Sequence, residues 1–130
     1  MTIPFWCLVF AMLMLVVTKV PVAVAQGRQG TGYDNQNPRD QQAGLTGWGR
    51  RALAAHQNAF ESFAPFAAGV LVAHVGGASG SAAAALAVAH VLSRILYTIL
   101  YIADLDKLRS LIWAVGFFSS VGLVLLPAFS

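Results

Sequence analysis

The chain has 130 residues, of which 58% are apolar and only 10% are charged, with a formal net charge of +3. A typical soluble domain carries about 25% charged residues, and a small domain has too much surface for its volume to hide this much apolar area from water. The single cysteine, Cys7, excludes an intramolecular disulfide and a cysteine metal cluster. The small, scattered positive charge argues against a nucleic-acid partner and suits the basic side of a membrane protein.

Four segments are predicted to cross the lipid bilayer, because a spanning helix needs about 20 mostly apolar residues. The second segment is the most polar, and its apolar part begins only at Phe60. The predicted spans cover residues 3–25, 51–75, 81–103 and 108–126. The sequence therefore predicts an all-α membrane protein, a single domain over residues 1–130 that is a bundle of four transmembrane helices.

The first span has a rival interpretation as a signal peptide, since Ala23-Val24-Ala25 resembles a signal-peptidase site. The segment Met1–Phe10 contains no Lys or Arg, so the basic region of a signal peptide is missing. Lys19, the nearest basic residue, stands at the wrong end. We therefore favour a retained span in which Lys19 extends its ammonium group to the lipid headgroups.

The connections between the spans predict a multi-pass protein with a defined orientation. The first connection (residues 26–49) and the third (residues 104–109) share one side of the bilayer, and they hold Arg28, Arg39, Lys107 and Arg109. The positive-inside rule places these two loops in the cytoplasm and both termini outside it. The first loop is rich in Gly, Asn and Gln, so we expect it to be irregular and mobile.

Two of the predicted spans carry polar residues along one face. Such residues are costly in lipid, so they face a bundle interior or a cavity and are functional candidates. At about 100° per residue, the stripe on the third span falls within about 60° and that on the second within about 80°. The stripes are His90, Arg94, Tyr97 and Tyr101 on the third span, and Arg51, Asn58 and Glu61 on the second. We expect them to face each other or a shared ligand.

A structural interpretation of the same residues stays open. Arg94 and Glu61 can form an ion pair that only holds helices together, since buried charges are usually paired. The tyrosines can be anchors at the membrane interface, a role that fits Tyr101 better than the deeper Tyr97.

No metal site and no standard catalytic motif is predicted. His90 lies deep in a span but has no carboxylate or cysteine companions for a metal ion. His56 stands near a helix end and is interpreted as incidental. The chain has no nucleophile elbow, no phosphate-binding glycine loop and no metalloprotease helix.

Several stretches resemble the MAPEG family, the membrane-associated proteins in eicosanoid and glutathione metabolism. Residues 54–66, AAHQNAFESFAPF, are similar to the second-helix pattern of that family, roughly R-A-x-x-N-x-x-E-x-x-P-x-F. Residues 94–101 look like the R-x-x-Y-x-x-x-Y helix of its leukotriene C synthase branch. The segment Asn37-Pro38-Arg39-Asp40 resembles an N-P-x-D piece of the family's first loop, and Arg109-Ser110 resembles an Arg-Ser pair of the prostaglandin E synthase branch.

The resemblance implies a homotrimer of four-helix protomers that binds glutathione between neighbouring subunits near the cytoplasmic face. It implies a lipophilic small-molecule substrate that enters from the lipid bilayer. Carried over residue by residue, it implies that glutathione contacts Asn58, Glu61, Arg94, Tyr97 and Tyr101. It also implies that Arg109 stabilises the thiolate, with Ser110 and Asp40 as helpers. Such roles are chemically sound, because an arginine can clamp a carboxylate bidentately and lowers the pKa of a neighbouring thiol.

The sequence departs from the family pattern at two cationic positions. Ala54 stands in place of the signature arginine, and Gln57 in place of a further arginine of the prostaglandin branch. Arg51 lies one turn before Ala54 on nearly the same face, so it is the predicted substitute in glutathione binding.

The predicted function is a glutathione-dependent transferase or peroxidase that acts on lipophilic electrophiles at the cytoplasmic face. The alternative is a non-enzymatic membrane or assembly protein that keeps the fold without glutathione chemistry. A small transporter subunit is disfavoured, because transporter sites favour broken helices and the middle of each span is expected to be free of helix-breaking residues.

Overall fold

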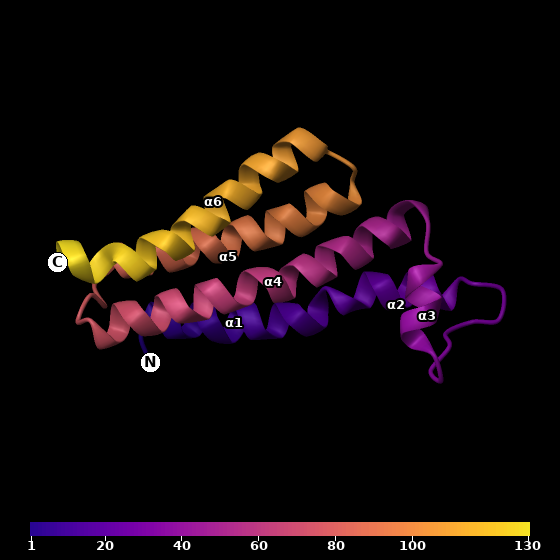
Figure 1. Cartoon of the computed structure of the whole chain (residues 1–130), viewed down its shortest axis with the longest axis horizontal. Coiled ribbons are helices and arrows are strands. Elements are labelled where there is room, and N and C mark those ends of the chain that lie inside the picture. Colours follow the sequence, from indigo (N-terminus) through magenta and orange to yellow (C-terminus); the bar gives the residue numbers. More distant parts are fainter.

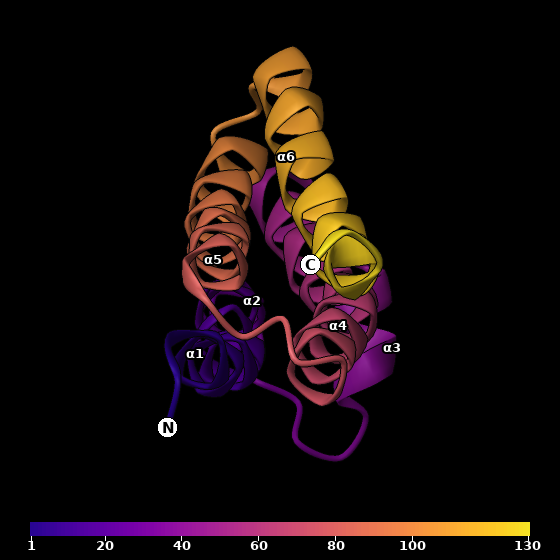
Figure 2. The same cartoon turned by 90° about the vertical axis from the view of Figure 1, so that its left-hand side faces the viewer.

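The computed structural model describes all 130 residues, and its regular elements are all helical. The helices are α1 (Ile3–Val17), α2 (Lys19–Gly27), α3 (Pro38–Ala43), α4 (Gly47–Val75), α5 (Ser81–Ile102) and α6 (Asp106–Leu125), followed by the 3-10 turn η1 (Leu126–Phe129). Seen along the long axis, α1, α4, α5 and α6 form a four-cornered bundle (Figure 2). The predicted all-helical class is confirmed.

Three helical segments are long and apolar enough to cross a membrane: Ile3–Gly27, Ser81–Ile102 and Asp106–Phe129. Their outer faces expose large apolar side chains such as Leu13, Leu92 and Phe118, as expected of surfaces that contact lipid. The longest helix, α4, is more polar because Arg50, Arg51 and Glu61 lie in its first half, and it packs against α1, α5 and α6. The structure supports the first, third and fourth predicted spans in this way. The second predicted span, residues 51–75, stays a prediction.

The first predicted span is present as one apolar segment, Ile3–Gly27, in which the helical hydrogen bonding is interrupted at Thr18. Pro21 has no N–H to donate, and its ring clashes with the carbonyl group of Val17, four residues earlier, in a regular helix. α1 therefore ends at Val17 and α2 begins at Lys19. The Thr18 hydroxyl donates to the Met14 carbonyl oxygen at 2.8 Å, which closes the end of α1.

Pro65, like Pro21, lies well inside a predicted span, contrary to the expectation that the spans lack helix breakers. Pro65 stands in the interior of α4, yet that helix runs without interruption from Gly47 to Val75. Pro65 therefore removes one backbone donor from α4 without ending it, and α4 does not become a broken helix of the kind that transporters use.

The ends of the bundle are chemically different. Both termini and the turn between α4 and α5 lie at one end, whereas the first loop, α3 and the turn between α5 and α6 lie at the other (Figure 1). The largest buried apolar cluster, Phe66, Val70, Ala73, Ala83, Ala87 and Leu123, fills the half of the bundle nearer the termini. The polar stripes therefore occupy the half that faces the loops.

The first loop is irregular over residues 28–37, as expected, but it forms the short helix α3 and is held by hydrogen bonds from glutamine side chains. Gln26 is fully buried, and its Nε2 donates to the Pro38 carbonyl at 3.2 Å and to Gln41 Oε1 at 3.1 Å. Gln41 Nε2 donates in turn to the Gly32 carbonyl at 2.8 Å. α3 begins at Pro38, which is well suited to the first position of a helix.

Candidate functional site

The two polar stripes meet at a cavity between α4, α5 and α6, here called the outer cavity. Its volume is about 150 Å³. The helix α6 supplies an aromatic and a small-residue wall, which the sequence did not predict. The polar lining residues are Asn58, Glu61 and Ser62 from α4, His90 and Arg94 from α5, and Ser120 from α6.

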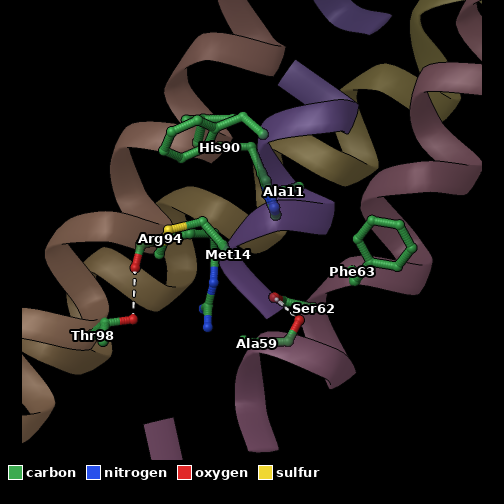
Figure 3. Close-up of a pocket in the computed structure, with 10 residues that line it drawn as sticks. Ala11, Met14, Ala59, Ser62, Phe63, His90, Arg94 and Thr98 are labelled. Atoms are coloured by element: carbon green, nitrogen blue, oxygen red, sulfur yellow. Dashed lines mark hydrogen bonds between the residues drawn. The ribbon is translucent and has the colours of Figure 1, made fainter. Parts of the chain in front are cut away.

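A second, narrow space lies on the other side of Arg94, between α1, α4 and α5, and is here called the inner slot. It has a volume of about 20 Å³, enough for a water molecule. Figure 3 shows Arg94 reaching from α5 into this slot, with Ser62 of α4 on the opposite wall. Because Ser62, His90 and Arg94 line both spaces, the Arg94 side chain separates the inner slot from the outer cavity.

Arg94 is a buried cation without a full set of partners. Its side chain is 7% exposed, and its Nη2 atom forms no hydrogen bond. The guanidinium carbon lies 4.3 Å from the centroid of the Tyr97 ring, a distance at which a cation is attracted by the aromatic face. A buried charge left unpaired is expensive, so Nη2 requires an acceptor from outside this protomer's own side chains.

The α4 side of the outer cavity offers a complementary pair. Asn58 Nδ2 donates to Glu61 Oε2 at 3.3 Å, while Asn58 Oδ1 is buried and has no partner. Glu61 itself is exposed at the mouth. Since Asn58 Oδ1 accepts and Arg94 Nη2 donates, the cavity suits a ligand that carries both an N–H donor and an anionic acceptor.

Aromatic rings connect Arg94 to the beginning of α6. The Tyr97 and Tyr101 rings meet edge to face with centroids 5.7 Å apart. The guanidinium carbon of Arg109 lies 4.2 Å from the centroid of the Tyr101 ring. The four predicted site residues Arg94, Tyr97, Tyr101 and Arg109 therefore form one continuous row from the cavity toward the loop end of the bundle.

Three other predicted site residues lie outside this row. Arg51 Nε donates to the Ile102 carbonyl at 3.2 Å, so it satisfies the C-terminal end of α5. Ser110 follows Arg109 but is exposed. Asp40 is exposed on α3, which packs on α2 and stands apart from α6 in Figures 1 and 2. Within one protomer, Asp40 does not approach Arg109.

His90 lines the site, as its position in the polar stripe of the third span predicted, although the family resemblance assigned it no contact with glutathione. Its ring stacks on Phe66 with centroids 3.9 Å apart, and Nδ1 lies 3.0 Å from the Gly116 carbonyl oxygen. A carbonyl only accepts, so Nδ1 carries the proton and Nε2 is left as an acceptor. The spacing of four residues between His90 and Arg94, which places both on one helical face, was the signal for this position.

Comparisons with known proteins extend these observations. No curated protein and no solved structure matches the chain. The model of the MAPEG family does match, over residues 3–129, and this range includes every helix described above. The chain therefore belongs to the MAPEG family and is a membrane protein of that family.

Proposed function

We propose that this MAPEG protein binds glutathione at the outer cavity and directs its thiol toward lipophilic electrophiles or peroxides that arrive through the bilayer. The observation that carries the proposal is the buried Arg94 guanidinium, whose Nη2 atom has no partner within the chain. A carboxylate is the natural partner for such a group, and Arg94 can grip it bidentately.

The other polar atoms of the cavity fit the rest of glutathione, which has two carboxylates, one ammonium group, amide N–H groups and a thiol. Asn58 Oδ1, which is buried and unpartnered, can accept from an amide N–H. Glu61 is exposed at the mouth and can receive the ammonium group. A donor, an acceptor and a carboxylate thus converge on one space lined by α4, α5 and α6.

The size of the outer cavity supports a site shared between subunits of a homotrimer. Its volume of about 150 Å³ is smaller than the roughly 300–1,000 Å³ of typical ligand pockets. One protomer therefore supplies part of the surface that glutathione needs, and a neighbouring subunit supplies the remainder. In this arrangement Asp40, which lies far from its own Arg109, reaches the site of the neighbour.

Glutathione supplies the reacting thiol, and the protein supplies a positive charge beside it. Arg109 is held against the face of Tyr101, with its guanidinium half-buried at the loop end of the bundle. A fixed positive charge beside a thiol favours the thiolate, which is the nucleophilic form. Ser110, next along α6, can donate a further hydrogen bond to it.

The mouth of the outer cavity is suited to an apolar second substrate. Trp113 and Phe117 of α6 line it with their rings stacked at 5.2 Å, and their side chains are 40% and 39% exposed. An aromatic rim open to lipid can hold a lipophilic electrophile beside the polar floor.

The alternative is a non-enzymatic membrane or assembly protein, and one observation favours it. Arg51, the predicted substitute for the missing family arginine at Ala54, is bonded to the Ile102 carbonyl instead. Gln57 supplies no charge either. In this alternative, the polar stripes only hold subunits together.

The test is the effect of glutathione on the thermal unfolding of the detergent-purified protein. Glutathione at a hundredfold excess over Kd is expected to stabilise the fold by about 2.7 kcal/mol. Arg94→Lys keeps the charge but loses the planar fork, so it should weaken this stabilisation. Arg50→Lys, the same change at an exposed position outside the cavity, should leave it unchanged. An absence of any stabilisation in the unmodified protein would reject the proposal in favour of the non-enzymatic alternative.

A further inference from the structure

A larger cavity, here called the loop cavity, lies beside the first loop. Its volume is about 460 Å³, and it is bounded by the α2 segment, the first loop, α3 and α4. None of its lining residues lines the outer cavity, so the two are separate spaces that share only α4. The residues that determine its chemistry are Lys19, Tyr33, Arg39, Leu53, His56 and Phe60.

The polar lining of the loop cavity is basic. Lys19, Arg39 and His56 face it, and no Asp or Glu is among its lining residues. Lys19 and Arg39 repel each other without a carboxylate between them, and an anion in the cavity would relieve this repulsion. The charge pattern therefore favours an anionic occupant and gives no partner to an ammonium group.

Lys19 is held in place by neutral groups that leave its charge uncompensated. Its Nζ donates to Gln26 Oε1 at 3.3 Å and lies 6.0 Å from the centroid of the Tyr33 ring. Gln26 is itself fully buried and fixed by the first-loop hydrogen bonds to Pro38 and Gln41. The ammonium group is thus positioned by the fold and does not move freely at the surface.

His56 is also held in place, by a contact that the sequence did not indicate. Its Nδ1 lies 2.9 Å from Thr18 Oγ1. Because the Thr18 hydroxyl proton is already donated to the Met14 carbonyl, Nδ1 must be the donor in this contact. The Nε2 atom of His56 therefore remains free for another partner.

The loop cavity lies where the first membrane span meets the loop. Lys19 belongs to the last part of the candidate span Ile3–Gly27, and Arg39 belongs to α3 beyond it. On the α4 side the wall is apolar: Leu53 contributes to it, and Phe60 is 53% exposed with its ring edge-on to His56 at 5.3 Å. A basic pocket with an apolar wall at this depth has the composition of sites for acidic lipid headgroups.

We propose that the loop cavity binds the phosphate group of an anionic phospholipid headgroup, with Lys19 and Arg39 donating to the phosphate oxygens and an acyl chain passing along Phe60. A headgroup such as phosphatidylglycerol carries a negative charge without an ammonium group, which matches a cavity that lacks carboxylates. Glutathione and phosphatidylcholine each carry a positive group for which this cavity has no partner. The proposal does not depend on glutathione binding at the outer cavity.

The experiment measures lipid binding to the detergent-solubilised full chain by native mass spectrometry and by thermal unfolding. The probes are short-chain phosphatidylglycerol, phosphatidylcholine of the same chain length, inorganic phosphate and glutathione. Phosphatidylglycerol should bind at least tenfold more tightly than phosphatidylcholine. Arg39→Gln should weaken phosphatidylglycerol binding about fivefold, since a basic residue near an anionic lipid contributes about 1 kcal/mol.

A matched variant controls for the loss of charge. Lys107→Gln removes one positive charge from an exposed position of α6 that does not line the cavity, and it should leave lipid binding unchanged. Arg39 is exposed, so Arg39→Gln should leave the lipid-free unfolding temperature unchanged and show that the fold is intact. Lys19→Met should then reproduce the weakened lipid binding.

Four results would overturn the proposal. The first is equal binding of the two phospholipids, and the second is an equal effect of Arg39→Gln and Lys107→Gln. The third is displacement of phosphatidylglycerol by inorganic phosphate at similar concentrations, which would assign the cavity to a free phosphate. The fourth is displacement by glutathione together with weaker glutathione binding in Arg39→Gln, which would assign it to the thiol substrate.

Discussion

Arg94 is the residue for which the ligand-binding and the structural interpretation make different predictions. A structural ion pair would join it to Glu61, yet Glu61 Oε2 accepts from Asn58 and Arg94 Nη2 has no hydrogen-bond partner. The Tyr97 ring offsets part of the burial of this charge, because its face attracts the guanidinium at 4.3 Å. In an isolated protomer the Arg94 Nη2 donor is therefore unpaired, and a ligand or a neighbouring subunit could supply its acceptor.

A double-mutant cycle on Arg94 and Glu61 tests which of these roles holds. Under the ligand hypothesis, Arg94→Ala should abolish glutathione stabilisation while its effect on unfolding stays additive with that of Glu61→Gln. Under the structural hypothesis, Arg94→Ala would leave the Glu61 carboxylate without its counter-ion, and the effects of the two substitutions on unfolding would be non-additive, with the double variant recovering part of the lost stability. Unchanged glutathione binding in Arg94→Ala, with rescue in the double variant, would reject the ligand hypothesis.

Among the helices, α4 and α6 approach closely at Gly69. A Cβ atom added there would lie 2.9 Å from the backbone oxygen of Ser120 and 2.9 Å from Leu123 Cβ, and neither atom can rotate away. Gly69→Ala is therefore expected to destabilise the bundle by about 1–3 kcal/mol, the usual cost of overpacking. In Gly122→Ala the new Cβ would meet only the movable methyl groups of Leu86, at 3.2 and 3.3 Å.

Chemical or thermal unfolding of both variants in the same detergent provides the measurement. Gly122→Ala is the matched control because the substitution and the detergent are the same and Gly122 also lies inside a long helix. A Gly69→Ala protein as stable as the Gly122→Ala protein would show that α4 and α6 are not packed as closely as the structure has them.

The sequence predicted the helix boundaries well where hydropathy alone determines them. It predicted them poorly where a single proline or a few side-chain hydrogen bonds determine them. α5 begins at the predicted Ser81 because apolar composition and a Gly/Ser turn both mark that point. The break at Thr18 was missed because uniform apolarity concealed the effect of Pro21 on the helix. The ordered first loop was missed because the pairing of Gln26 with Gln41 cannot be read from composition.

The same distinction applies to the candidate site. Helical periodicity was enough to place Asn58 and Glu61 on the face of α4 that meets Arg94. Periodicity does not predict contacts between distant segments, so the hydrogen bond from Arg51 Nε to the Ile102 carbonyl could not be predicted from the sequence. The contact of His56 with Thr18 was hidden for the same reason.

For the whole molecule, the arrangement of the loops makes the predicted orientation testable. The first loop and the turn between α5 and α6 lie at one end of the bundle, opposite both termini (Figure 1). This end carries Arg28, Arg39, Lys107 and Arg109, which the positive-inside rule places in the cytoplasm. Reporter fusions at Ser130 should therefore report a location outside the cytoplasm, and fusions within residues 30–41 a cytoplasmic one. A cytoplasmic C-terminus would contradict this orientation.

The proposed glutathione site is incomplete within one protomer. The outer cavity is too small for glutathione alone, and Arg94 Nη2 and Asn58 Oδ1 lack partners within the chain. Beside this cavity, Ala64 and Ala68 are exposed on α4 at a spacing of four residues, and small residues at this spacing allow close helix contact in membranes. We therefore expect this face of α4 to meet a neighbouring subunit, in the homotrimer that the family resemblance implies.

Native mass spectrometry in mild detergent should show three copies of the chain, and Ala68→Leu should shift the population toward monomers by preventing close helix approach. Because glutathione would then lack the neighbouring part of its site, Ala68→Leu should also remove the glutathione-induced stabilisation while leaving the helix content unchanged. The two losses should occur together, since both arise from the same contact. A persistent monomer or dimer in the unmodified protein would exclude the trimer. A monomeric Ala68→Leu protein that still binds glutathione with unchanged affinity would instead place the whole ligand site within one protomer.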